Sequence, residues 1–147
     1  MSFQVCVDAN IVLKLVLNET DSAQAVLLWQ DWLRRGAEII APYHLIFETT
    51  SVLTNYGHRR LMTPEEGQMA FALVRSQPIQ FLHPSQLTER AWTLAQQFKR
   101  PTAYDCFYLA LAELTGCELW TADRRLYSAV THSLPWVKWL GDYRAPA

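Results

Sequence analysis

The sequence has little of several residue types that common enzyme sites require. Only five glycines are present, and none of them forms a phosphate-binding loop, which argues against an NTPase or a dinucleotide-binding protein. The four histidines and three cysteines show no metal-like spacing, so a zinc site is not expected. No serine lies in the G-x-S-x-G setting of a nucleophile elbow. These absences leave the carboxylates as the main candidates for chemistry.

Net charge and long apolar runs are also scarce. The formal net charge is −1, so the chain lacks the strongly basic surface of a non-specific nucleic-acid binder. No apolar run approaches the roughly 18 residues of a membrane span, and the first ten residues lack the basic flank and long apolar run of a signal peptide. The cysteines are odd in number and widely separated, which favours reduced thiols. We therefore expect a cytoplasmic protein that does not associate with membranes.

Hydrophobic residues, by contrast, are abundant. They make up 50% of the 147 residues, and six Trp, six Tyr and six Phe are present. A chain of this length can build a core without disulfides or metals, so one domain over residues 1–147 is expected. So many aromatic residues also predict an exposed apolar patch, of the kind that meets another copy or a partner.

Short apolar runs alternate with amphipathic helical patterns along the chain. Strands are predicted at residues 3–7, 38–41, 79–82, 117–120 and, as an edge strand, 136–140. Helical segments are predicted at 13–17, 22–35, 43–59, 63–76, 84–99, 104–115 and 124–130. Short strands separated by long helices favour a parallel sheet covered on both faces. The predicted fold class is therefore α/β, a three-layer α/β/α sandwich with a short, mainly parallel central sheet.

Four acidic residues stand where such a fold binds its ligands or places buried charge. Asp8 directly follows the first predicted strand, and Asp123 comes shortly after the fourth. Open parallel sheets bind ligands beyond these carboxyl ends of the strands. Glu48 lies within a predicted helix among apolar neighbours, and Asp105 lies at the start of a nearly apolar helix. Carboxylates that face a core require compensation of their charge.

Each acid has a simpler interpretation when taken alone. A turn explains Asp8, helix capping explains Asp105 and Asp123, and a solvated helix face explains Glu48. None of these explains why all four would face one cleft at the strand ends. Four carboxylates that converge there suit Mg²⁺ or Mn²⁺, which take oxygen ligands. Sites of this kind usually hydrolyse phosphodiester bonds.

The same acids carry a resemblance to a known family. Residues 5–10 (V-C-V-D-A-N) resemble the first motif of the PIN-domain family, a strand followed by D-x-N or D-x-S, and residues 47–49 (F-E-T) match its helical glutamate. Residues 104–112 (Y-D-C-F-Y-L-A-L-A) are similar to its third motif, and residues 119–126 (L-W-T-A-D-R-R-L) to its fourth. Each motif is short, but their order and placement match from end to end. The chain resembles in particular the VapC-type toxin ribonucleases.

The resemblance implies a function and a set of site residues. It implies a Mg²⁺- or Mn²⁺-dependent endoribonuclease, the toxin of a type II toxin–antitoxin pair, which acts on RNA, forms a homodimer and binds a cognate antitoxin protein. Asp8, Asp105 and Asp123 would then be metal-site acids, and Glu48 a ligand or a nearby supporting acid. Asn10 and Thr121 would orient them through hydrogen bonds. Some members carry a further acid after the fourth-motif aspartate, where this chain has arginines, so a second metal position would be weak or filled only with substrate.

Several basic residues are candidates for RNA contact, since each is close in sequence to one of the acids. Arg59 and Arg60 end the helix of Glu48, Arg100 precedes Asp105, and Arg124 follows Asp123. Ordinary helix-end cations are an equal alternative for each of them. Arg124 is the favoured phosphate contact.

Two other functions compete with the nuclease. A non-catalytic PIN-like module that binds RNA or protein would tolerate replacement of the acids and bind no metal. A phosphotransfer protein of similar topology requires two acids at the first strand, as D-x-D or as an adjacent pair, and here Asp8 stands alone. The phosphotransfer interpretation is therefore remote.

Overall fold

The computed structural model describes residues 3–146, and its centre is one parallel sheet of five strands. The strands are β1 (Gln4–Val7), β2 (Glu38–Ala41), β3 (Ile79–Phe81), β4 (Glu118–Thr121) and β5 (Val137–Trp139). Their order across the sheet is β3-β2-β1-β4-β5, so the chain fills one half of the sheet and then crosses back to fill the other. The strand order therefore reverses between β1 and β4, which pair in parallel with Cys6 opposite Leu119.

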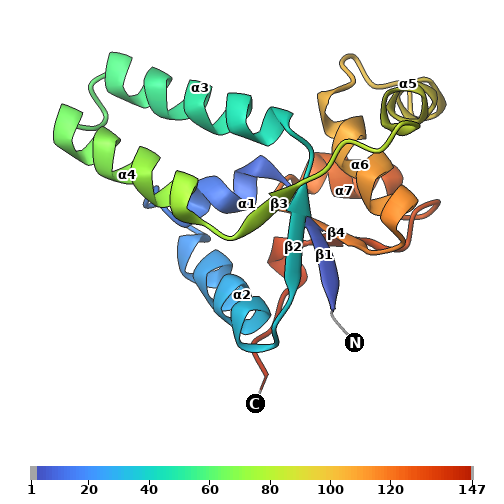
Figure 1. Cartoon of the computed structure of the whole chain (residues 1–147), viewed down its shortest axis with the longest axis horizontal. Coiled ribbons are helices and arrows are strands. Elements are labelled where there is room, and N and C mark those ends of the chain that lie inside the picture. The colour runs from blue at the N-terminus through green and yellow to red at the C-terminus, as the bar shows by residue number, and fades with distance from the viewer. Residues whose placement is uncertain (1–2, 147) are drawn as a thin grey trace.

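Seven helices connect the strands. They are α1 (Ala9–Lys14), α2 (Ser22–Arg34), α3 (His44–His58), α4 (Pro64–Ser76), α5 (Leu87–Gln97), α6 (Tyr104–Thr115) and α7 (Arg124–Val130), and a 3-10 turn, η1 (Leu140–Asp142), follows β5. Right-handed crossovers in opposite directions place α1–α4 on one side of the sheet and α5–α7 on the other, as Figure 1 shows. The α/β/α sandwich predicted from the sequence is confirmed.

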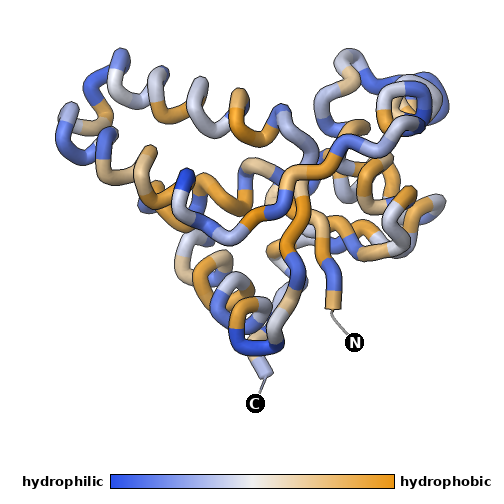
Figure 2. Tube along the Cα trace, viewed as in Figure 1, coloured by the Kyte–Doolittle hydropathy of each residue, from blue (hydrophilic) through white to orange (hydrophobic). Residues whose placement is uncertain are grey.

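The core lies between the sheet and its covering helices. β1 is completely buried from Val5 to Val7, and α6 is completely buried from Tyr108 to Ala112. Figure 2 shows hydrophobic residues gathered along the strands and on the inner faces of the helices. Both faces of β1 are therefore shielded from water. A carboxylate that follows this strand can meet solvent only at the carboxyl edge of the sheet.

Local signals explain where several helices begin and end. Thr63 caps α4 with the predicted capping box, since its hydroxyl accepts from the Glu66 N–H at 3.1 Å while the Glu66 carboxylate accepts from the Thr63 N–H at 2.9 Å. Gly116 ends α6 with φ +71°, a left-handed conformation that a residue without Cβ adopts readily.

Two predicted helices had wrong boundaries. The first helix begins at Ala9 and ends at Lys14, so the apolar residues 15–17 follow it and do not form it; the reason is that Asp8 caps the helix directly after β1. The helix predicted from residue 84 begins at Leu87, because the N–H of Leu87 bonds to the carbonyl of Pro84 in a preceding turn. Residues 1, 2 and 147 of the predicted domain lie outside the described residues. Within residues 3–146, no helix combines the length and apolar character needed to cross a bilayer.

Candidate active site

The four predicted acids come from four elements that meet at the carboxyl edge of the sheet. Asp8 follows β1 and caps α1, and Asp123 follows β4 and caps α7 by accepting from the N–H groups of Arg125 and Leu126. Glu48 lies one turn into α3, and Asp105 lies in the first turn of α6. Asp8 and Asp123 thus flank the point where the strand order reverses, which is where open parallel sheets bind ligands.

Asp8 is the most buried of the four acids, with 3% of its surface exposed. The Thr121 hydroxyl donates to Oδ2 at 2.9 Å, and the Asn10 N–H donates to Oδ1 at 3.4 Å. Burial raises the pKa of Asp8 to about 8, and the carboxylates of Asp105 and Glu48 add to the rise, while the two hydrogen bonds oppose it. The site therefore holds more negative charge than its own donors neutralise.

Asn10 and Thr121 join the two strand ends through one hydrogen-bond network. The Asn10 side-chain amide donates to Thr121 Oγ1 at 3.3 Å and accepts from the Ala122 N–H at 2.9 Å. Thr121 Oγ1 also accepts from the Asp123 N–H at 3.0 Å. Because Thr121 is completely buried, its hydroxyl fixes the carboxylate of Asp8 relative to the backbone that carries Asp123.

Glu48 is held by two residues that sequence reasoning did not include in the site, His44 and Tyr108. His44 Nε2 lies 2.9 Å from Oε1 of Glu48, an ion pair when His44 is protonated, and the Tyr108 hydroxyl donates to the same oxygen at 3.3 Å. The His44 ring also packs against Tyr108 at 4.6 Å between centroids. The i, i+4 spacing of His44 and Glu48 on one helix was the signal that could have identified this pair.

Asp105 faces both a cation and the other acids. Its Oδ2 lies 3.7 Å from Nη2 of Arg100, yet its pKa is raised, first by burial and then by the charges of Asp123 and Glu48. Arg100 and His44 act in the opposite direction. The charges of Asp105 and Glu48 act on Asp8, and those of Asp123 and Glu48 act on Asp105, so the four carboxylates lie near one another at the carboxyl edge of the sheet.

The donors in this space fit a hard cation in kind, since they are carboxylate and hydroxyl oxygens. A positive ion there would reverse the repulsion that raises the pKa values of Asp8 and Asp105. In the arrangement described for residues 3–146, however, no three acidic, histidine or cysteine side chains converge closely enough to hold a metal ion between them. The carboxylates would have to draw together around an ion.

The basic candidates divide into near and far groups. Arg100 contacts Asp105, and the Arg124 guanidinium lies over the Trp139 ring at 5.2 Å, directly after Asp123 in the chain. Arg59 and Arg60 follow α3, whose rise of about 1.5 Å per residue puts them roughly 16 Å along the axis from Glu48. The structure therefore places Arg59 and Arg60 away from Glu48 along the helix, and their contact with RNA remains a prediction.

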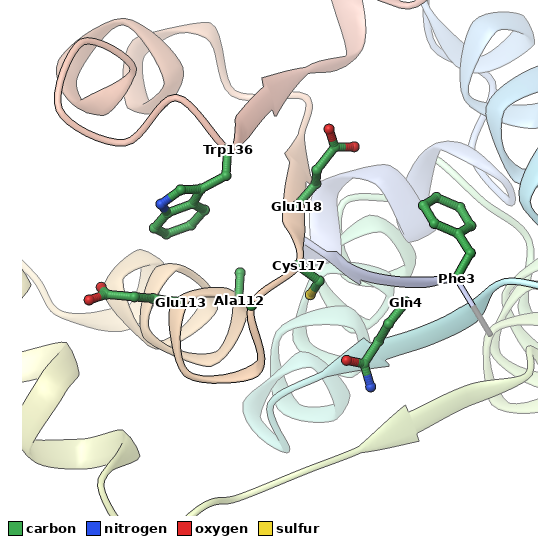
Figure 3. Close-up of a pocket in the computed structure, with 8 residues that line it drawn as sticks. Phe3, Gln4, Ala112, Glu113, Cys117, Glu118 and Trp136 are labelled. Atoms are coloured by element: carbon green, nitrogen blue, oxygen red, sulfur yellow. The ribbon is translucent and has the colours of Figure 1, made fainter. Parts of the chain in front are cut away.

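A separate hollow of about 700 Å³ lies at the opposite, amino edge of the sheet. Figure 3 shows it between the start of β1, the end of α6 and the residues around β4 and β5; it is lined by Phe3, Gln4, Ala112, Glu113, Gly116, Cys117, Glu118 and Trp136. None of the four acids borders it, and ligands of parallel sheets bind at the other edge. The carboxyl edge therefore remains the candidate active site.

Several solved structures share the fold. One is a chain of a toxin–antitoxin complex from Klebsiella pneumoniae, with a TM-score of 0.62 and 20% identity over 92% of this chain and 97% of that chain. The second is PAE2754 from Pyrobaculum aerophilum, with a TM-score of 0.63 and 22% identity over 88% of this chain and 86% of that chain. The third is VapC20 of Mycobacterium tuberculosis, a sarcin–ricin-loop-cleaving toxin, with a TM-score of 0.61 and 19% identity over 85% of this chain and 94% of that chain. At these identities the likeness establishes the fold.

Sequence relatives and a family model extend the match. The chain is 30% identical over 123 residues to the VapC ribonuclease Mb0985 of Mycobacterium bovis and to the ribonuclease VapC9 of Mycobacterium tuberculosis, covering 83% of this chain and 87% of each relative. The model of the PIN domain matches residues 5–131, a segment that contains all four acids. On this evidence the chain belongs to the PIN-domain family.

Proposed function

We propose that this protein is a metal-dependent endoribonuclease that hydrolyses RNA phosphodiester bonds at the site of Asp8, Glu48, Asp105 and Asp123. The observation that carries the proposal is the Asp8 carboxylate, buried at the reversal of strand order with its pKa raised to about 8 by burial and by two neighbouring acids. A fold gains nothing in stability from such a group, which supports a functional reason for it. The names of the relatives, VapC ribonucleases, support the choice of RNA.

Asp8, Asp105 and Asp123 are the residues that would hold Mg²⁺ or Mn²⁺. When bound, such an ion activates water for attack on phosphorus and offsets charge on the leaving oxygen. The protein's own part is to position oxygen donors: Thr121 orients Asp8, the N–H groups at the start of α7 orient Asp123, and Arg100 stands beside Asp105. Arg124, next to Asp123, is proposed to contact a substrate phosphate.

Glu48 has a different role in this proposal. Its Oε1 already accepts from Tyr108 and faces His44, so one of its oxygens is occupied by groups of the protein. A carboxylate held in this way is suited to accept a proton from water or to orient it, as well as to bind an ion through its free oxygen. We therefore propose that Glu48 positions the attacking water.

We further propose that the protein is the toxin of a type II pair, inhibited by a cognate antitoxin protein, and that it acts as a homodimer. The toxin part is supported by the relatives named VapC and by the fold shared with a toxin–antitoxin complex. The dimer rests on the family resemblance and on exposed aliphatic side chains such as Leu61 and Met69. A neighbouring gene for a small DNA-binding protein would add support.

A second function has one observation in its favour. Because no three candidate ligands converge within the described residues, a PIN-like module that binds RNA or protein without cutting is the alternative. It predicts that Asp8→Asn and Asp105→Asn still bind the RNA or protein partner as the wild type does, and that the wild type binds neither Mg²⁺ nor Mn²⁺.

Cleavage of a mixed RNA panel separates the two functions. Purified protein would be incubated with Mn²⁺, with Mg²⁺ and with EDTA, beside Asp8→Asn, Asp105→Asn and the control Asp142→Asn, which removes an exposed carboxylate outside the site. The nuclease predicts cutting with metal that is lost in EDTA and in the first two variants only. Cutting that survives in both site variants, or none with either metal, would refute it.

A further inference from the structure

We propose that Tyr43, Phe47 and Tyr104 form a stacking surface for unpaired RNA bases beside the acidic site. We call these three residues the aromatic rim. The inference rests on the nuclease function proposed above and adds the side chains that would hold the bases next to the cleaved bond.

The rim residues face water to an unusual degree for large aromatic side chains. Phe47 is 70% exposed, Tyr104 is 63% exposed and Tyr43 is 52% exposed. Each is therefore free to offer a ring face to a ligand. Figure 1 shows the starts of α3 and α6, which carry the rim, close together above the carboxyl ends of the strands.

Two of the rim residues adjoin site acids. Phe47 precedes Glu48 on α3, and Tyr104 precedes Asp105 on α6. The Tyr104 ring lies 6.2 Å from the ring of His44, the residue beside Glu48. A base stacked on Tyr104 would thus be attached to a phosphate that can reach the carboxylates.

Tyr43 extends the rim along the same edge of the sheet. It follows β2, and its ring stacks on Phe81, the last residue of β3, at 6.0 Å between centroids and an angle of 21°. This contact fixes the Tyr43 ring on one face and leaves more than half of the residue open to solvent. The rim therefore runs from the end of β3 to the start of α6, past Glu48.

The chemistry of the rim fits bases better than an apolar protein surface. The exposed large apolar residues at the starts of α3 and α6 are all aromatic. The exposed large aliphatic residues of residues 3–146 lie elsewhere, on α2, after α3, on α4 and near the end of α6: Leu27, Leu33, Leu61, Met69, Leu73 and Leu114. Bases of any sequence stack on aromatic rings, and proteins recognise single-stranded RNA largely in this way.

Charge favours the same occupant. The chain has a net charge of −1, and its site is acidic, so phosphate attraction alone cannot supply much affinity for RNA. Stacking adds affinity without positive charge. A duplex keeps its base faces inside the helix, so only unpaired bases have access to the rim.

Equilibrium binding of a labelled, mixed-sequence RNA tests the proposal. The unpaired strand and the same strand annealed to its complement would be titrated with the whole protein, in EDTA and again in Ca²⁺. The variants are Phe47→Leu, Tyr104→Leu and their combination, which keep apolar bulk but remove the ring. Trp92→Leu on α5, 66% exposed and on a helix that carries no site acid, is the matched control.

Each rim variant should bind the unpaired strand about fivefold or more weakly, and the combination more weakly still. Trp92→Leu should bind like the wild type, and the duplex should bind poorly to all of them. The inference would be overturned if the wild type and the rim variants bound the unpaired strand equally well, or if Trp92→Leu lost as much affinity as they do. It would also be overturned if the wild type cut RNA with Mn²⁺ but bound the strand in neither buffer.

Two further outcomes point elsewhere and are distinguishable. Rim variants that change the sedimentation of the free protein but not its RNA affinity would overturn the stacking surface and make the rim an interface between copies of the chain. A wild type that neither binds nor cuts RNA would refute the proposed nuclease itself.

Discussion

Asp8→Asn is expected to stabilise the metal-free protein, and to do so more strongly as the pH rises. The Asp8 carboxyl is buried, and its pKa in the folded protein is about 8 against an ordinary value of 3.8. The amide of asparagine has the same shape but carries no charge at any pH. The variant therefore keeps the packing of Asp8 and removes its ionisation.

The sign of the effect follows from proton linkage. A group whose pKa is higher in the folded than in the unfolded protein contributes stability that is fully present below about pH 4 and is lost as the pH rises toward 8. The loss is about 1.4 kcal/mol per pH unit in this window, or about 4 kcal/mol by pH 7. The stabilisation by Asp8→Asn should thus be about 3 kcal/mol larger at pH 7.5 than at pH 5.

Urea unfolding in EDTA, at pH 5 and at pH 7.5, measures this difference for the wild type and for Asp8→Asn. In thermal unfolding the gain at pH 7.5 should appear as a rise in Tm of about 10 °C. Asp142→Asn, an exposed acid outside the site, serves as the control and should show no such dependence. A stability difference between wild type and Asp8→Asn that does not grow with pH would show that Asp8 is ionised without cost, and the electrostatic argument for the site would fail.

Three other substitutions test separate parts of the account. Thr121→Val removes the hydroxyl that bonds to Asp8, so urea unfolding should show a loss of about 2 kcal/mol and the RNA cleavage rate should fall at least about tenfold; wild-type values for both would contradict the network. Thr63→Ala removes the cap of α4 and should lower stability by about 1 kcal/mol with cleavage unchanged, whereas slower cleavage would mean that this helix start belongs to the site. Gly141→Ala places a methyl group against the Trp139 ring and should lower Tm by a few degrees, by about 1 kcal/mol of strain; an unchanged Tm would show that the ring moves freely.

The sheet and the positions of the acids were predictable because both depend on local sequence. Each strand is a short apolar run between polar or helix-forming segments, and Asp8 directly ends the most buried of them. In a parallel sheet, residues that follow neighbouring strands meet at one edge, so Asp8 and Asp123 could be placed together without a structure. The capping signals at Thr63 and Gly116 were equally local.

The contacts that support Glu48 were not predictable in this way. They depend on the approach of α3 to α6, which brings the Tyr108 hydroxyl to the carboxylate, and no sequence pattern encodes that distance. The same limit applies to Arg59 and Arg60, which are near Glu48 in sequence but lie roughly 16 Å along α3 from it, so their contact with RNA remains a prediction. Spacing along one element is informative, whereas the approach of two elements depends on packing.

The most direct test of the central claim, that these acids act together as a cation site, is calorimetric titration of Mn²⁺ into the metal-free protein at pH 7.5. The account predicts saturable binding accompanied by release of protons, since Asp8 must ionise, with binding weakened at least about tenfold in both Asp8→Asn and Asp105→Asn and unaltered in Asp142→Asn. Absence of binding in the wild type, or equal binding in all four proteins, would contradict the claim and leave a PIN-like binding module as the better account.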